Sequence, residues 1–434
     1  MTEPTSTPDT DARPALPAPA PTPDEQRTAL RRLLAVLTLG TLLAISTGTA
    51  KTVAVVVALI VMIMLHELGH FLTARWGGMK ATEFFVGFGP RLWSVRKGET
   101  EFGVKAIPTG GYVKIIGMSN LETVDPADEP RTYRQQSFPR RLAVAVAGST
   151  VHLILAFLLI FTVVSVVGVP RASMRVGEVS ALESGPSPAQ QAGFEVGDRI
   201  ISVDGQAFDE WSDLPPYIRA NPGRALRFSV ERDGRTIELV ATPVDLANIE
   251  VEGRPVATEP TGFVGIGPAT AFERVNPIVG VGQAGRGVGV GVVEVVRALG
   301  RIFSPDGISN YFKLLSGQAP EGPGDGDENR FLSPVGFVKV ASQAANTGLF
   351  EVLSLLIAIN LFVGVFNMLP MLPLDGGHVA IAVYERVRSR RGRRYQLDVA
   401  RLMPATYLVF ALILFIGVTS LYLDVVRPLA NPFQ

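Results

Sequence analysis

The sequence contains no cysteine, few histidines and few charged side chains. Without cysteine, the chain has no disulfides, thiolate metal sites, iron–sulfur clusters or cysteine nucleophiles. Its four histidines are His66, His70, His152 and His378, so any histidine-based site draws on these positions. Charged residues make up 18% of the chain, against about 25% in an ordinary soluble domain. The net charge of zero argues against a nucleic-acid-binding protein that relies on bulk positive charge.

Long apolar runs are abundant instead, and they predict a membrane protein. Hydrophobic residues account for 47% of the chain, and the mean hydropathy is +0.28. A helix needs about 20 apolar residues to cross a bilayer. Four segments meet this length and are predicted as transmembrane helices, namely 52–74, 142–169, 349–378 and 402–425. A fifth segment, 30–50, is shorter and is either an extra membrane segment or a signal sequence.

The segments outside these runs indicate the orientation in the membrane. Residues 1–26 contain seven prolines and no apolar period, which predicts a disordered tail. Eleven Lys and Arg residues lie in 75–141, and seven Arg residues lie in 384–401. Because short basic loops stay in the cytoplasm, both loops are expected to be cytoplasmic. The region of about 170–348 is then expected outside the cell membrane.

The first part of this outer region has the pattern of a small β-rich domain. Leu226, Phe228 and Val230 alternate with polar residues, and Asp233-Gly234 predicts a hairpin turn. Three stretches precede this hairpin, at 187–189, 192–194 and 197–205. The pattern resembles a PDZ domain of the bacterial protease type, expected at 172–245. Such a domain binds a peptide or a protein terminus by adding it to a sheet edge.

Residues 246–348 are predicted as an extracytoplasmic linker or amphipathic region. Six of the twelve residues from Gly280 to Gly291 are glycine. A phosphate-binding loop is disfavoured, because no Gly-Lys-Ser/Thr sequence follows them. A surface helix or loop of small residues near the membrane is the preferred interpretation.

The sequence His66-Glu67-Leu68-Gly69-His70 lies at the cytoplasmic end of a predicted spanning helix. Residues four apart lie on one face of a helix, so His66 and His70 can hold one metal ion with Glu67 beside it as a base. Polar groups in an apolar helix are costly and are usually functional or paired. The alternative is a pair of packed structural histidines.

A catalytic zinc site requires a third protein ligand. Thr73 and Trp76 occupy the positions at which soluble zincins continue their pattern, so the third histidine of those enzymes is absent. Glu83 is the nearest glutamate after the histidine pair, and spacing does not exclude it. Asp375 is the better candidate, because it too lies at the cytoplasmic end of a predicted span, after Pro370 and Pro373 break the helix. A helix-capping aspartate is the alternative interpretation.

Together these patterns resemble the site-2 protease family of intramembrane zinc metalloproteases, in its bacterial RseP-like branch with one PDZ domain. The resemblance rests on H-E-x-x-H, the PDZ-like insert and the later N-x-x-P-x-x-P-L-D-G sequence that begins at Asn367. A further stretch at 80–120 looks like the membrane-reentrant β-loop of this family. The implied fold is a multi-pass α-helical membrane protein with a membrane-reentrant β-hairpin and an inserted β-rich PDZ domain on the extracytoplasmic side.

The resemblance also implies roles for single residues. Zn²⁺ would be held by His66, His70 and Asp375, with Glu67 as the catalytic base. Asn367 would hold the substrate, or it forms a hydrogen bond between helices. Three residues of the β-loop, namely Gly110, Gly111 and Tyr112, would contact the substrate or support the site. His152 stands where the family often has an asparagine. It either orients the substrate carbonyl or a metal ligand, or it is a buried histidine bonded to a neighbouring helix. His378 is expected to support the site or the fold and not to bind the metal.

The implied activity is hydrolysis of a peptide bond in or near the transmembrane segment of single-span membrane proteins. Substrates of the anti-sigma factor or remnant signal peptide type are expected. The protein itself is expected to contact the lipid bilayer and not to bind nucleic acid. The active site would face the cytoplasmic side of the cell membrane. The rival interpretations are a membrane metal transporter and an inactive membrane scaffold built on the PDZ domain.

Overall fold

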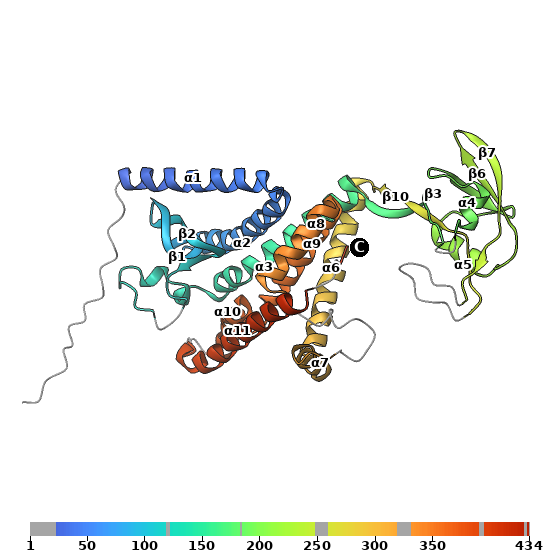
Figure 1. Ribbon diagram of the computed structural model, residues 1–434. Helices are drawn as coiled ribbons and strands as arrows, with labels where there is room; N and C mark the ends of the chain where they lie inside the picture. Colours follow the sequence, from blue (N-terminus) through green and yellow to red (C-terminus); the bar gives the residue numbers. More distant parts are fainter. Residues whose placement is uncertain are drawn as a thin grey trace, which may run out of the picture. The chain divides into compact units, whose positions relative to one another are not determined.

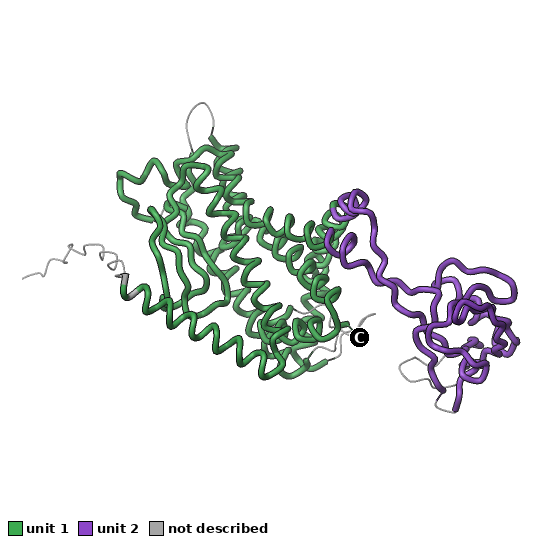
Figure 2. The backbone as a smooth tube through the Cα atoms, turned by 90° about the horizontal axis from the view of Figure 1, so that it is seen from above, with its two compact units in different colours: residues 1–160, 285–434 green, residues 161–284 purple. Residues whose placement is uncertain are grey.

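The chain divides into two compact units in the computed structural model (Figure 2). The structure describes residues 23–118, 122–182, 185–247, 259–318, 331–389, 395–428 and 432–433. Unit 1 comprises residues 1–160 and 285–434, and unit 2 comprises residues 161–284. The predicted tail lies outside the described residues up to position 22, and residues 23–26 already belong to the first helix.

Most of the chain outside the β-rich part folds into long helices (Figure 1). Their bounds are α1 Pro23–Ser46, α2 Ala50–Trp76, α3 Phe138–Thr162, α6 Pro277–Ile302, α7 Pro305–Leu315, α8 Pro334–Thr347, α9 Leu349–Phe366, α10 Asp375–Arg388 and α11 Met403–Val426. Among the described residues, six helical segments are long and apolar enough to cross a membrane: Gln26–Ser46, Ala50–Trp76, Phe138–Val167, Pro277–Ile302, Leu349–Phe366 and Val399–Val426. Five of them coincide with the segments singled out in the sequence.

The sixth apolar helix, α6, lies in the region that was expected to be a linker or amphipathic segment. Its glycines do not interrupt it, and it runs without a break through Gly280–Gly291. Its charged residues are Arg286, Glu294, Arg297 and Arg301, all of them exposed. Their spacing of eight, three and four residues places them on one face of the helix. The helix is therefore amphipathic as well as apolar enough to span.

The segment predicted as one helix over 349–378 is divided in the structure. α9 ends at Phe366, turns occupy 367–374, and α10 begins at Asp375. Pro370 and Pro373 explain the break, because proline has no N–H to continue a helix. The backbone N–H of Gly376 donates to the carbonyl of Asn367 at 2.7 Å and closes the turn. Asp375 thus opens a new helix.

A β-hairpin in unit 1 follows α2 directly. It is formed by β1 Ala81–Lys97 and β2 Thr100–Ile115. Residues 83–86 of β1 face 111–114 on one side and 101–104 on the other. The curled hairpin therefore has two outer edges, 111–115 and 91–97. α1 lies beside the hairpin and contacts β1 (Figures 1 and 2).

Apolar side chains hold the base of the hairpin against the helices. The buried cluster consists of Phe71, Ala74, Met79, Ala81, Ile115, Tyr133 and Val144. It joins the end of α2, both strands and the start of α3. Burying large apolar side chains of this kind stabilises by about 1.5–3 kcal/mol each. The base of the hairpin is therefore fixed, whereas Phe88, Leu92 and Ile107 near the other end are exposed.

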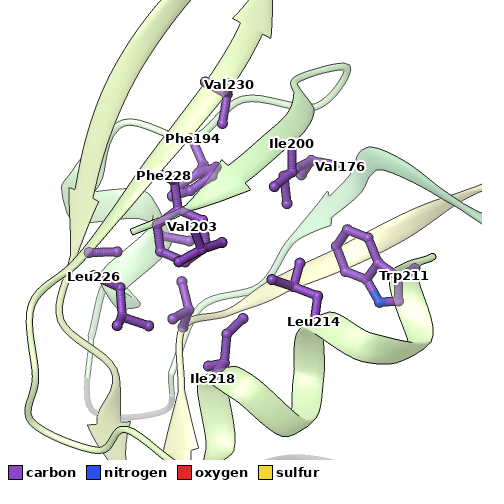
Figure 3. Packing of buried hydrophobic residues seen from close by; sticks show 13 residues of the cluster. Val176, Phe194, Ile200, Val203, Trp211, Leu214, Ile218, Leu226, Phe228 and Val230 are labelled. Atoms are coloured by element: carbon purple, nitrogen blue, oxygen red, sulfur yellow. The ribbon is translucent and has the colours of Figure 1, made fainter. Parts of the chain in front are cut away.

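Unit 2 is built around an antiparallel sheet in the order β10-β3-β4-β6-β7. The strands of unit 2 as a whole are β3 Val169–Val179, β4 Arg199–Val203, β5 Gln206–Ala207, β6 Leu226–Arg232, β7 Arg235–Ala241, β8 Val244–Asp245, β9 Gly262–Phe263 and β10 Ile266–Glu273. The short helices α4 Pro188–Ala192 and α5 Leu214–Arg219 accompany the sheet. Leu226, Phe228 and Val230 are fully buried, so the alternation in the sequence marks the inner face of β6 (Figure 3).

The β-rich domain extends beyond the predicted 172–245. β10 pairs with β3 from Ile266↔Val179 to Glu273↔Val169, so the domain includes a strand from the far side of a gap in the described residues. This strand pairs with the start of the domain, and such a distant partner is not visible in local sequence periodicity. The two ends of the domain leave it side by side.

Asp198 ties together the loop before β4 and the strand β6. Its two carboxylate oxygens accept hydrogen bonds from Arg232 at 2.7 Å each, and the N–H of Glu195 donates to Oδ2 at 2.9 Å. Burial alone would raise the pKa of Asp198, but the hydrogen bonds from Arg232 and Glu195 outweigh it and hold the pKa below its ordinary value. Because the pKa of Asp198 falls on folding, the charged form of this carboxylate stabilises unit 2.

We expect Asp198→Asn to lower the free energy of unfolding of unit 2 by about 2–3 kcal/mol, because Arg232 then loses its buried carboxylate partner and keeps only the exposed Glu195 as an acidic partner. In the unmodified chain this stabilisation is complete above the ordinary pKa near 3.8 and is lost as the pH falls toward the lower folded value. Amide hydrogen exchange of β4 and β6 in the full-length protein measures both effects. Asp209→Asn, at an exposed position, is the control. Equal exchange in the two variants would contradict this account.

Candidate metal centre

Helix α2 brings His66 and His70 to one buried face near its C-terminal end. Both side chains are 7% exposed. Their Nε2 atoms are 3.2 Å apart, so both imidazoles point to the same place. Both histidines lie within one uninterrupted helix of 27 residues, so their i, i+4 spacing places them on the same face.

Asp375 completes a three-atom cluster with these histidines. Its Oδ2 lies 3.4 Å from Nε2 of His66 and 3.3 Å from Nε2 of His70. A tetrahedral zinc ion with bonds of about 2.0–2.1 Å would separate its ligand atoms by about 3.3–3.4 Å. The three atoms thus have the spacing of three corners of such a tetrahedron, and a catalytic zinc held by them would take a water or the substrate as its fourth ligand. Within the described ranges, this is the one cluster of at least three potential metal ligands.

The hydrogen bonds around the cluster fit a cation. Nδ1 of His70 is 2.8 Å from the carbonyl oxygen of Val144, which can only accept. Nδ1 therefore carries the proton, and Nε2 presents a lone pair toward the cluster. Oδ2 of Asp375 is buried and has no hydrogen-bond partner in the described part of the chain. A buried carboxylate oxygen facing two imidazole nitrogens is costly unless a positive ion lies between them.

Glu67 lies beside this cluster and touches the β-hairpin. Its Oε2 accepts a hydrogen bond from the backbone N–H of Val113 at 3.1 Å. Gly111 passes closely over the same helix, because a Cβ there would lie 2.6 Å from Sδ of Met64. The outer edge 111–115 of the hairpin therefore runs along the face of α2 that carries Glu67.

Helix α3 supports both histidines from the opposite side. Its residue Val144 orients His70, as described above. Gly148 leaves room for His66, because a Cβ at this position would lie 2.3–2.5 Å from three atoms of the imidazole ring. A Cβ on Gly69 of α2 would lie 2.9 Å from Cγ2 of Val151 and 3.1 Å from the carbonyl oxygen of Ala147, both in α3. The two helices approach through these glycines, and the imidazoles are fixed by that approach.

His152 is buried on α3 near the same site. Its ring centroid is 5.0 Å from that of His66. Its Nδ1 is 2.8 Å from Oδ1 of Asn360, while Nδ2 of Asn360 donates to the carbonyl of Leu356 at 2.8 Å. Asn360 is fully buried in α9 and was not singled out in the sequence. A lone asparagine within a run of apolar residues was the signal that could have identified it.

The other residues named in the sequence lie around the cluster or on the hairpin. Asn367 caps the end of α9, and its carbonyl holds Gly376, next to Asp375. Tyr112 donates its hydroxyl hydrogen to Glu83 and accepts from Lys105 at 2.8 Å. Burial and the nearby carboxylate of Glu83 raise the pKa of Tyr112. Glu83, the alternative third ligand, is thus engaged on the hairpin and is not part of the cluster.

Two further predicted residues flank these elements. A Cβ on Gly110 would lie 2.9 Å from the ring of Phe88, so glycine allows the two strands to pack there. His378 lies one turn after Asp375 on α10, and its ring packs edge-on against Tyr133 with centroids 6.1 Å apart. Burial lowers the pKa of His378, which favours the neutral imidazole. His378 is not in the metal-ligand cluster.

The family model of peptidase family M50 matches residues 54–414 of this chain. The zinc metalloprotease Rip1 of Mycolicibacterium smegmatis is 32% identical over 403 residues, which cover 86% of this chain and 96% of that protein. Rip1 of Mycobacterium tuberculosis H37Rv is also 32% identical, over 404 residues with the same coverage. A putative zinc metalloprotease of Brucella suis is 31% identical over 348 residues, covering 76% of this chain and 84% of the relative.

These matches confirm the resemblance to the site-2 protease family and the assignment of zinc. The matched segment begins at residue 54, so α1 lies before it. With its apolar helices and its two-histidine, one-carboxylate cluster, the chain belongs to peptidase family M50 and is a zinc metalloprotease with several membrane-spanning helices.

Proposed function

We propose that this protein is an intramembrane endopeptidase that hydrolyses a peptide bond in or near the transmembrane segment of single-span membrane proteins. The supporting observation is the position of the ligand cluster. His66 and His70 lie within an apolar helix, and Asp375 is held beside them by a turn that directly follows another such helix. A metal site in this position acts on substrates that enter from the bilayer. The basic loops at this end of the helices support a cytoplasmic position for the site.

His66, His70 and Asp375 would hold the zinc ion, and Glu67 would be the general base. The ion, when bound, acts as a Lewis acid toward a water and the scissile carbonyl. Glu67 accepts the proton of that water on its carboxylate and delivers it to the nitrogen of the leaving amine. Nδ1 of His70 keeps its proton on the carbonyl of Val144, which holds the imidazole in orientation throughout.

The hairpin edge 111–115 is the proposed site at which the substrate unwinds. A peptide bond within a helix is shielded by its own hydrogen bonds, and a strand edge offers replacement bonds as the helix opens. This edge lies against Glu67, because the backbone N–H of Val113 donates a hydrogen bond to the Glu67 carboxylate. The exposed Phe88, Leu92 and Ile107 give the hairpin an apolar end that suits insertion into lipid. Gly110, Gly111 and Tyr112 would therefore face the substrate backbone.

Asn367 and His152 have different proposed roles. Asn367 would hold the substrate, because it stands at the start of the turn that leads to Asp375. His152 would be a buried histidine that joins α3 to α9 behind His66. Its bond to Asn360 supports this second interpretation.

Unit 2 is the proposed substrate filter, with a PDZ-like peptide site. A hollow of about 160 Å³ lies between α5 and the glycine-containing segment 262–268, lined by apolar residues such as Trp211, Leu214 and Phe263. A side chain of an extended peptide or a protein terminus fits a space of this kind. A folded domain of this size outside the membrane would also exclude bulky substrates until another protease has trimmed them. Anti-sigma factors and remnant signal peptides fit such a requirement.

We expect Glu67→Gln to lower the rate of substrate cleavage by roughly 10²–10⁴-fold, because the base is lost while the ligands remain. Cleavage of a single-span substrate without an outer domain, by purified protein in lipid vesicles, measures the rate, and metal analysis measures bound zinc. Glu99→Gln, on the exposed part of the hairpin, is the control. Cleavage at an unchanged rate in Glu67→Gln would rule out this function.

We expect Gly148→Ala to weaken zinc binding roughly tenfold or more, because the added methyl group displaces the ring of His66. Competition with a chelating dye measures the dissociation constant. Gly417→Ala is the matched control, since it changes a glycine of α11 with open space around it. Identical zinc affinities in the two variants would show that the ring of His66 does not depend on α3.

We expect removal of residues 169–273 to let the enzyme cut substrates that still carry a folded outer domain. Val169 and Glu273 are paired residues, so a short Gly-Ser linker can join Gly168 to Arg274. Cleavage is compared for one single-span substrate with and without its outer domain, and zinc content shows that the metal centre is intact. Continued refusal of the bulky substrate by the shortened enzyme would refute the filter.

A further inference from the structure

A buried ion pair connects α3 to the far end of α10. Nη1 of Arg141 is 2.5 Å from Oε2 of Glu385, and the two side chains are 9% and 8% exposed. Oε1 of Glu385 also accepts the N–H of Leu397 at 2.7 Å. The guanidinium lies 5.1 Å above the ring of Tyr133, whose hydroxyl donates to the carbonyl of Arg141 at 3.2 Å. Both charges are therefore held in a defined geometry.

Stability alone does not explain a pair of this kind. Removing two charges from water is costly, and a well-packed apolar pair of similar volume is often as stable. A buried ion pair specifies one relative position of two elements, because each charge left alone is strongly unfavourable. The question is then which position of α10 relative to α3 this pair specifies.

Helix α10 carries Asp375 at its start and Glu385 near its other end. Asp375 and Glu385 are ten residues apart, about 15 Å along a helix. Hollows of about 320 and 450 Å³ flank α10, and Ile381 lines both of them. On these flanks, side chains of the described residues do not fill the space beside α10. A contact at the end remote from Asp375 is then needed to fix its tilt and axial position.

Helix α3 contacts both histidines of the cluster and also α10, the helix that carries Asp375. Arg141 lies one turn before Val144, which orients His70, and two turns before Gly148, which accommodates His66. The same two turns of α3 thus contact both histidines and, through Arg141, the helix that begins with Asp375. We propose that Arg141 and Glu385 are positioning residues that hold α10 against α3, so that Asp375 meets His66 and His70. This proposal rests on the zinc site of the proposed function.

The test is the zinc affinity of the full-length protein in detergent, measured by dye competition after the metal has been removed and returned. Glu385→Gln removes the charge while its amide oxygen still accepts from Leu397. Arg141→Met removes the other charge at similar length. The double variant leaves no lone buried charge, so we expect it to fold with unchanged helix content and melting behaviour. We expect roughly 10–100-fold weaker zinc binding in all three variants.

The control is Glu99→Gln, which breaks the exposed Arg131–Glu99 pair and should leave the zinc affinity unchanged. A folded double variant with the zinc affinity of the unmodified protein would overturn the proposal, because a merely structural pair predicts this result. Should the double variant fail to fold, Glu385→Asp replaces it, since it keeps the charge but withdraws the carboxylate by one methylene. Unchanged affinity in folded Glu385→Asp and Glu385→Gln would equally overturn the proposal.

The two proposals fail in different ways. An unmodified protein that binds no zinc at these residues overturns both the zinc site and the positioning role. An unmodified protein that binds zinc, together with folded variants of equal affinity, overturns the positioning role alone.

Discussion

The convergence of three polar atoms in an apolar environment is the constraint on which the rest of this structure depends. His66, His70 and Asp375 bring these atoms within 3.2–3.4 Å of one another, although 305 residues separate His70 from Asp375 in the sequence. Such an arrangement is unfavourable without a cation, because the buried carboxylate oxygen of Asp375 meets no hydrogen-bond donor among the described residues. A divalent ion converts the same arrangement into a stable and reactive centre.

The surrounding elements follow from the need to hold this cluster. α2 supplies two of the proposed ligands and the proposed base on one turn, and the prolines after α9 end that helix so that α10 can begin at the proposed third ligand. α3 supplies none of the three proposed ligands but contacts both histidines and α10, through the carbonyl of Val144, the missing side chain of Gly148 and the charge of Arg141. The hairpin approaches from another side and brings the backbone of Val113 to Glu67.

Local patterns in the sequence were sufficient for the parts of the metal centre and of the β-rich domain that depend on spacing. The i, i+4 histidines, the alternation of Leu226, Phe228 and Val230, and the prolines before Asp375 each express a geometric rule within a few residues. The shared position of the two remote segments at cytoplasmic ends of predicted spans indicated their pairing, and the family resemblance supported it. What local patterns did not reveal depends on distant partners. β10 completes a sheet begun at Val169, and Glu385 meets Arg141 across 244 positions. For the glycine-rich segment the sequence left a surface helix or a loop open and did not predict that α6 is apolar enough to span, because glycines weaken a helical pattern.

The most direct test of the central claim is X-ray absorption at the zinc edge of the purified full-length protein, compared with Asp375→Ala. The account predicts one zinc per chain with two nitrogen ligands at about 2.0–2.1 Å and carboxylate oxygen at about 2.0–2.2 Å, and loss of the oxygen contribution from the carboxylate in the variant. An unchanged spectrum and unchanged zinc content in Asp375→Ala would contradict it.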